Sequence, residues 1–374
     1  MEPTNLEPAA APIAAAPIAA VPTAAPAAAP AAAPIAAAAP AAAPGAAPAA
    51  GHPRRERLRR RLGLAAVIAC LPYLGLKLLW VCGVDVGVVD RSRLGVGAWA
   101  VANLLTFLMD ATAALIARQL ARPGGPRMRG PFLALPMWVA SGLLAPIMIA
   151  VPLQTLAGLF RGQGLLGKPD GFLEPWVFGL VYGGFLVEGV ALLGAFALYA
   201  HDRLGPVLDA PVRAFARRVP GGVRTAVAVA AGLLAVTAAV RIAWASGAEF
   251  GLSAVQVAGA NRSSLRLVEA VQGVLALAAA GGLAVLARGR AGTRVRVPLV
   301  AAWVGSATAF GWGGFIGGLG AFPTGRLPTA IATAVCLAEA AAGFLVVGAG
   351  LAALGGRASA PADGLDGLDG LDGE

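Results

Sequence analysis

Eight long apolar runs constrain the fold of this chain more than any other feature of its sequence. They cover residues 62–84, 97–119, 132–154, 175–200, 223–246, 264–287, 297–320 and 329–353. Each run is long enough to cross a hydrocarbon core of about 30 Å as a helix. Backbone groups in lipid need hydrogen-bond partners within their own segment, which a helix provides. We therefore predict an all-α membrane protein with eight transmembrane helices.

Basic residues gather in alternate loops between these runs. Twenty of the 29 Lys and Arg residues fall on the side that eight crossings share with the N-terminus, and seven fall on the other side. Cytoplasmic loops carry such an excess, so both termini are predicted to be cytoplasmic. The Ala, Gly and Arg bias fits a GC-rich bacterial genome, which predicts a multi-pass protein of the bacterial cytoplasmic membrane, in contact with the lipid bilayer. Topology explains the net charge of +10 better than nucleic-acid binding, and no nucleic-acid partner is expected.

The two ends of the chain differ in composition from the rest. Residues 1–52 are almost entirely Ala and Pro, and proline every few residues blocks a continuous helix. This segment is predicted to be a disordered cytoplasmic tail, and residues 356–374 a disordered acidic tail. One interpretation of the first tail is a solvated segment. The other is a spacer, or a ligand for a cytoplasmic protein partner.

A motif at the end of the first run returns 164 positions later. Residues 77–87 and 241–251 each place a cation, a Trp, a Gly, an acid and a Gly at identical spacing. Further matches at a similar distance are Trp138 with Trp303 and Glu188 with Glu339. We predict two repeats of four helices, residues 53–204 and 205–355. Because four crossings restore the orientation, the repeats are parallel.

Charged residues inside the runs are the candidates for function, because charges in a bilayer are costly. The predicted site residues among them are Lys77, Asp110, Glu188, Arg241 and Glu339, and Glu269 lies close to the outer end of the sixth run. One interpretation is structural ion pairing, and the other is a path for a substrate or ion. Pairing predicts Lys77 near Glu188 and Arg241 near Glu339, or the same pairs exchanged between the repeats.

Corresponding stretches of the third and seventh runs carry helix-breaking residues. Pro146 and Pro152 lie in the third run, and residues 311–320 of the seventh contain six glycines, including Gly313 and Gly314. Paired interruptions in two repeats point to a transporter's binding site, with Gly313 and Gly314 in the substrate path. Gly-x-x-x-Gly spacing also suits close helix packing, and both interpretations stand at this point.

No soluble-enzyme motif accompanies the runs, and neither catalytic residues, a cofactor nor a metal site is expected. Pro72-Tyr73 ahead of Lys77 and Trp80 resembles the opening of a group of uncharacterised multi-pass membrane proteins of high-GC bacteria. The resemblance covers about twenty residues and implies a polytopic membrane protein without assigning an activity. The first hypothesis is a transporter or permease for a small polar or anionic solute, and the alternative is a non-transporting scaffold or signalling partner.

Overall fold

The computed structural model describes residues 53–89, 96–128, 130–160, 173–217, 219–254, 257, 262–289, 292–317 and 329–355. Both predicted tails lie outside these ranges. The described part of the chain is built from helices and contains no strand. The elements are α1 (Pro53–Val81), α2 (Val96–Leu120), α3 (Gly130–Phe160), α4 (Pro175–Leu208), α5 (Val212–Ala216), α6 (Gly221–Ala245), α8 (Arg262–Arg288), α9 (Arg296–Thr308), the π-helix η1 (Ala309–Gly317) and α11 (Ala330–Gly355).

Seven of the described helices are long and apolar enough to cross a membrane, which fits a multi-pass membrane protein. They are α1, α2, α3, α4, α6, α8 and α11. Many of their large apolar side chains, such as Ile68, Leu115 and Val236, point away from the protein interior. Such a surface would be unfavourable in water. In lipid it is the outer face that is expected of a membrane helix.

The predicted run at residues 297–320 is not among these seven helices. It forms α9, which ends at Thr308, and then changes to the wider hydrogen-bonding pattern of η1 from Ala309. The change begins just before the glycine-rich stretch, where the glycines lower the preference for the α-helix. Residues 318–320 lie outside the described part of the chain. The sequence predicted a broken helix here, and the described residues instead stay helical to Gly317 in the π-helical pattern.

The matching prediction for the third run is wrong. Pro146 and Pro152 both lie inside α3, which continues without interruption from Gly130 to Phe160. A proline removes one backbone donor and bends a helix without necessarily ending it, because the remaining hydrogen bonds of the turn stay in place. The two halves therefore do not share an unwound segment at corresponding positions.

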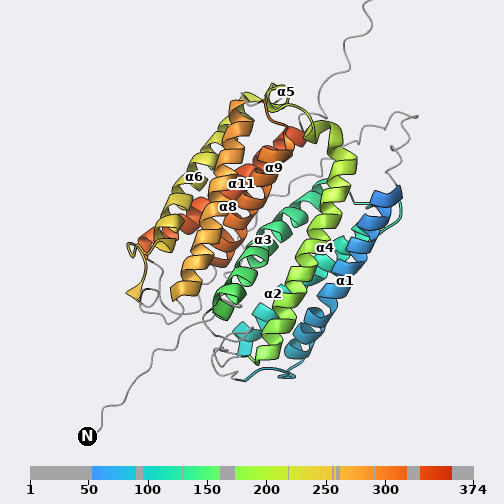
Figure 1. Ribbon diagram of the computed structural model, residues 1–374, viewed down its shortest axis with the longest axis vertical. Helices are drawn as coiled ribbons and strands as arrows, with labels where there is room; N and C mark the ends of the chain where they lie inside the picture. Colours follow the sequence, from blue (N-terminus) through green and yellow to red (C-terminus); the bar gives the residue numbers. More distant parts are fainter. Residues whose placement is uncertain are drawn as a thin grey trace, which may run out of the picture.

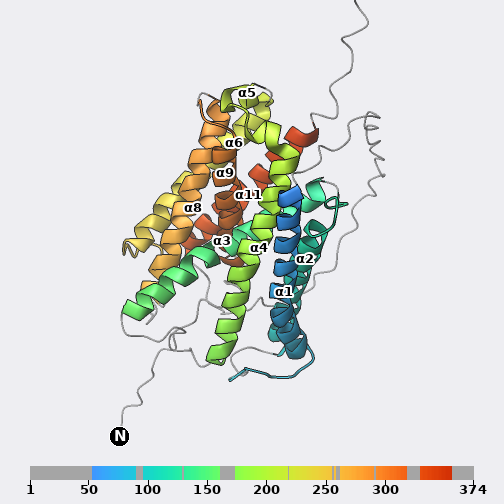
Figure 2. The same ribbon diagram turned by 45° about the vertical axis from the view of Figure 1, so that its right-hand side comes forward.

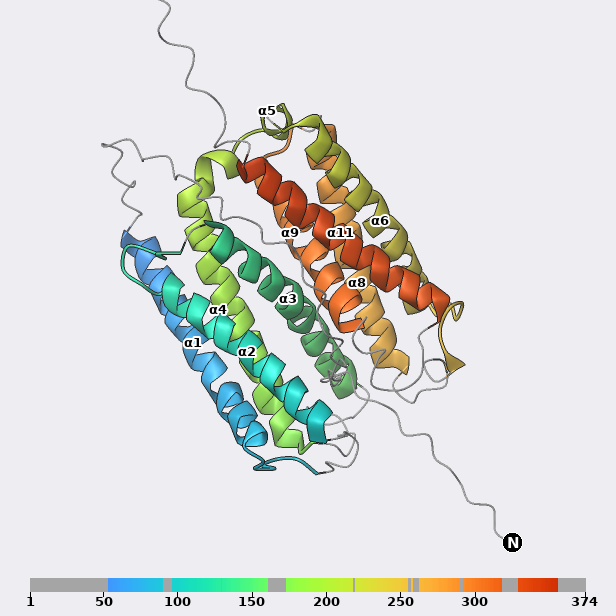
Figure 3. The same ribbon diagram turned by 180° about the vertical axis from the view of Figure 1, so that it is seen from behind.

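The helices form two groups that lie side by side (Figures 1 and 3). In the first group α1 packs against both α2 and α4, and in the second α6 packs against both α8 and α11. Figure 2 shows α1 and α2 at one edge of the molecule and α6 and α8 toward the other. Helix α3 lies between the groups and contacts α9, α8 and η1 of the second one.

Small residues let the helices of the two groups approach closely. A Cβ on Gly142 of α3 would overlap the backbone carbonyl of Ala307 in α9. Beside this contact the Trp138 indole N–H donates to Ser306 Oγ at 3.2 Å, and both residues are buried. A glycine at the crossing point allows backbones to touch, as in other membrane helix pairs.

Loop contacts fix which helix ends lie together. The Val212 N–H donates to the Thr293 carbonyl, and the Val295 N–H to the Ala210 carbonyl, both at 3.0 Å. These bonds hold the start of α9 beside the start of α5. At the opposite end of α6, the Thr329 hydroxyl donates to the Gly251 carbonyl, which places the start of α11 there.

Candidate functional site

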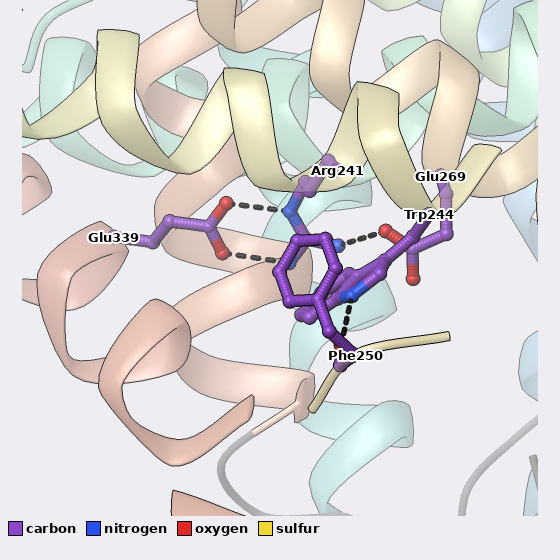
Figure 4. A network of polar contacts seen from close by, with 5 residues as sticks. All are labelled: Arg241, Trp244, Phe250, Glu269 and Glu339. Atoms are coloured by element: carbon purple, nitrogen blue, oxygen red, sulfur yellow. Dashed lines mark hydrogen bonds and ion pairs between the residues drawn. The ribbon is translucent and has the colours of Figure 1, made fainter. Parts of the chain in front are cut away.

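A buried ion network joins three helices of the second group. The Arg241 guanidinium of α6 contacts both Glu339 oxygens of α11, through Nε at 2.6 Å and Nη2 at 2.7 Å. Its Nη1 contacts Glu269 Oε2 of α8 at 2.7 Å (Figure 4). Arg241 is 6% exposed and Glu339 is fully buried. The predicted pair of Arg241 and Glu339 is therefore confirmed, in the bidentate geometry that suits a guanidinium and a carboxylate.

Gly313 of η1 lies directly against this network. A Cβ at this position would overlap the Glu339 carboxylate and lie 2.8 Å from Arg241 Nη2. The neighbouring Gly314 lies against α11, where a Cβ would be 2.9 Å from the backbone of Ala340. Both glycines thus leave room for contacts within the protein. This arrangement supports the packing interpretation of the glycine-rich stretch.

The equivalent cation of the first group has a different partner. The Lys77 ammonium, on α1, donates to Asn103 Oδ1 of α2 at 2.9 Å. It also lies over the rings of Tyr73 and Trp80, 4.8 Å and 5.1 Å from their centres. Lys77 is 4% exposed, and Asn103 is buried with its amide donating back to the Trp99 carbonyl. A neutral amide and two aromatic faces thus surround this cation.

Asp110 lies near both Lys77 and Glu188, and neither acid forms an ion pair with Lys77. Asp110 of α2 interacts electrostatically with Glu188 of α4 and with Lys77. No ion pair within 4.0 Å joins Lys77 to either acid in the described structure, so the predicted pair of Lys77 and Glu188 is wrong. Glu188 is buried beside the Cys70 thiol, and Asp110 Oδ2 is buried without a hydrogen-bond partner.

The seven predicted site residues therefore fall into two separate clusters. The first cluster contains Lys77, Asp110 and Glu188, and the second contains Arg241, Glu339, Gly313 and Gly314. If every acid is ionised, each cluster contains one cation and two carboxylates, counting Glu269 in the second. The two clusters differ in their ion pairs. The Arg241 guanidinium binds both acids of its cluster, whereas the Lys77 ammonium binds neither acid of its own.

Sequence reasoning missed two members of these clusters. Asn103 is a single amide within an apolar run, and its position 26 residues after Lys77 gives no signal that the two side chains meet. Glu269 is visible as an acid near the end of a run, but its contact with Arg241 depends on how α8 packs on α6. Among the described residues, no group of three His, Cys, Asp or Glu side chains is placed to hold a metal ion.

The turns after α1 and α6 have the same hydrogen bonds. The Trp80 indole donates to the Val86 carbonyl, and the Trp244 indole to the Phe250 carbonyl, both at 2.8 Å. Three backbone bonds of each turn match at the same spacing, from the residues two, three and four positions after the Trp. Positive φ values occur at both glycines of each turn, namely Gly83, Gly87, Gly247 and Gly251.

The second glycine of each turn contacts the start of the last helix in its group. The Gly87 carbonyl accepts from the Glu174 N–H at 2.9 Å, immediately before α4, and the Gly251 carbonyl accepts from Thr329, immediately before α11. A Cβ on Gly87 would overlap Val177, and one on Gly251 would lie 2.6 Å from Ile331.

Comparison with family models, with curated proteins and with solved structures found no match to this chain.

Proposed function

We propose that this chain is a proton-coupled transporter for a small polar or anionic solute, in which Lys77, Asp110 and Glu188 form the ion and substrate path. The observation that carries the proposal is the unpaired state of this cluster inside membrane helices. Glu188 and Lys77 are 3% and 4% exposed, and no ion pair within 4.0 Å joins the three residues. Ionisable residues placed in this way in membrane helices mark substrate and proton paths in other proteins.

Charge balance connects the cluster to proton coupling. With both acids ionised the cluster carries one excess negative charge in a medium that stabilises charge poorly. A bound proton would remove that excess. An anion beside Lys77 would be repelled by Asp110 and Glu188 unless protons neutralise them, so the solute and protons would enter together.

The architecture that we propose for this transporter has eight crossings, with α9 and η1 as the seventh. Its support comes from the loop contacts. Val295 is bonded to Ala210 just before α5, which lies at one end of α6 (Figure 1), and Thr329 is bonded to Gly251 beyond the other end. The chain between Val295 and Thr329 therefore passes from one end of α6 to the other.

We also propose that the chain consists of two parallel repeats, with termini in the cytoplasm of a bacterium. The matching turns after α1 and α6 support the two repeats, because both turns share the same indole, backbone and glycine geometry. The contact of Gly142 with Ala307 gives independent support. These residues are 165 positions apart, as are Trp138 and Trp303, and equivalent residues meet where a two-fold axis passes between repeats.

The alternative, a non-transporting scaffold, is favoured by the second cluster. Arg241 has two carboxylate partners and Gly313 fills the adjacent space, which leaves this cluster no free group for a solute. Under this alternative the charges of both clusters serve to align helices. The behaviour of the first cluster therefore separates the two functions.

Proton flux into proteoliposomes tests the proposal. We expect vesicles that contain the protein and an internal pH dye to acidify faster than protein-free vesicles when a pH gradient is applied with small anions such as phosphate, acetate or lactate. Glu188→Gln should lower the protein-dependent rate at least about tenfold, a difference typical of losing a group that relays protons. Glu269→Gln is the matched control and should keep most of the flux. Flux equal to that of protein-free vesicles with every anion would favour the scaffold.

A further inference from the structure

An apolar cavity of about 440 Å³ lies between the two helix groups, at the end of the molecule where α5 is found. Helices α3, α5, α6, α8, α9 and α11 all contribute to its wall. Its volume falls within the range of about 300–1,000 Å³ that is usual for small-molecule sites. The lining is apolar throughout except for one charged residue, Arg224. A polar solute would lose its hydration here without gaining hydrogen bonds, so the cavity is unsuited to the transported solute proposed above.

Arg224 gives the cavity a single polar feature. It lies in the first turn of α6 and is exposed, and its side chain has no ion-pair or hydrogen-bond partner among the described residues. Two other helices that line the cavity also carry exposed Arg residues. They are Arg213 in α5 and Arg288 at the end of α8. Basic residues beside a pocket between membrane helices favour anionic headgroups.

We propose that this cavity binds one acyl chain of an anionic phospholipid, whose phosphate pairs with Arg224. An acyl chain that enters the cavity from the bilayer exchanges one apolar surrounding for another, so its fit to the cavity and the contact of its phosphate decide the binding. The cation accounts for the choice of an anionic over a neutral lipid. The site joins α3 to the helices of the second group, so the bound lipid would stabilise their contact. This inference is independent of whether the protein transports a solute.

Glycines of α11 provide a filling variant and its control. Gly350 lines the cavity and Gly348 does not. A Cβ added at either glycine meets no atom within 4 Å, and both residues are exposed. Gly350→Phe should therefore occupy the cavity without disturbing the helix contacts, whereas Gly348→Phe adds the same ring two residues away.

Native mass spectrometry of the full chain in neutral detergent tests the proposal with phosphatidylglycerol and phosphatidylcholine of identical acyl chains. We expect wild type and Gly348→Phe to retain one phosphatidylglycerol in preference to phosphatidylcholine, and Gly350→Phe to lose that adduct. Arg224→Gln should lower the preference about fivefold, the value of one basic residue near a lipid phosphate. Glycerol phosphate, which lacks the chain, should not bind.

Two results would overturn the assignment. Equal retention of both lipids by the wild-type protein would make the cavity a groove for any membrane lipid. Equal retention of phosphatidylglycerol by wild type and Gly350→Phe would place the lipid elsewhere on the surface. If Gly350→Phe fails to fold, the lipid preference of Arg224→Gln decides, and an unchanged preference contradicts the proposal.

Discussion

Replacing Glu339 by alanine is expected to lower the free energy of unfolding by about 3–5 kcal/mol, the usual cost of leaving one member of a buried ion pair without its partner. Glu339 is fully buried, and its two oxygens bind Arg241 Nε and Nη2 at 2.6 and 2.7 Å. Removing them leaves the guanidinium with Glu269 alone, in a setting that water reaches poorly. Denaturant titration in detergent micelles measures the change.

Two further variants make this result specific. Glu269→Ala removes a carboxylate whose side chain is 26% exposed, and water can replace part of its interaction with Arg241. Its effect should be less than half that of Glu339→Ala. The double variant Arg241→Met with Glu339→Met removes both members of the pair and should recover most of the lost stability. A loss below about 1 kcal/mol for Glu339→Ala would contradict the role of this network.

Gly313→Ala is expected to cost at least about 3 kcal/mol, although it adds one methyl group, because overpacking adds to the loss of an ion pair. The added Cβ would overlap the Glu339 carboxylate. That carboxylate cannot move aside without breaking its bonds to Arg241. The unfolding measurement that serves for Glu339 also serves here, with Gly281→Ala in α8 as the control, since a Cβ at Gly281 meets no atom within 4 Å.

The effect of Gly313→Ala should depend on Glu339. In the background of Glu339→Ala the carboxylate is gone, and the remaining close neighbour of the added methyl group is Arg241 Nη2, the end of a flexible side chain that is then free of Glu339 and can shift. The second substitution should then cost less than about 1 kcal/mol, so the two changes are far from additive. Equal costs of Gly313→Ala in both backgrounds would show that the glycine is needed for another reason, such as the π-helical geometry of η1.

The apolar runs were the most predictable part of this fold. A bilayer allows a segment of that length and composition only one backbone structure, so seven of the eight runs could be located from composition alone. The run at 297–320 was harder, because its glycines weaken the α-helix and the sequence does not show which pattern replaces it. The prolines led to a wrong prediction of an interrupted helix, since α3 accommodates Pro146 and Pro152 without ending.

The set of buried charges was predictable from the sequence, but only one of the two predicted pairs was correct. Arg241 and Glu339 meet as expected, because a guanidinium in low dielectric needs a carboxylate and α11 brings one to it. Lys77 satisfies the same need with Asn103 and two aromatic rings. An ammonium is small enough to be held in that way, and which helix supplies its partner depends on packing that no spacing in the sequence encodes.

The turns after α1 and α6 carry information of a different kind. The sequence showed a shared pattern of Trp, Gly and acid without giving its purpose. The structure supplies that purpose, because each Trp closes its turn and each second glycine seats the last helix of its group. A pattern that performs the same task twice is the strongest support for the two proposed repeats.

Two parallel repeats of four crossings each require that α9 and η1 carry the chain across the membrane. The direct measurement is single-cysteine labelling with a membrane-impermeant maleimide, in a background where Cys70, Cys82 and Cys336 are serine. Two positions flank the segment, Gly292 before α9 and Ala330 at the start of α11. We expect that Ala330→Cys is labelled on intact cells and Gly292→Cys only after permeabilisation. Labelling of both positions from the same side would contradict this expectation.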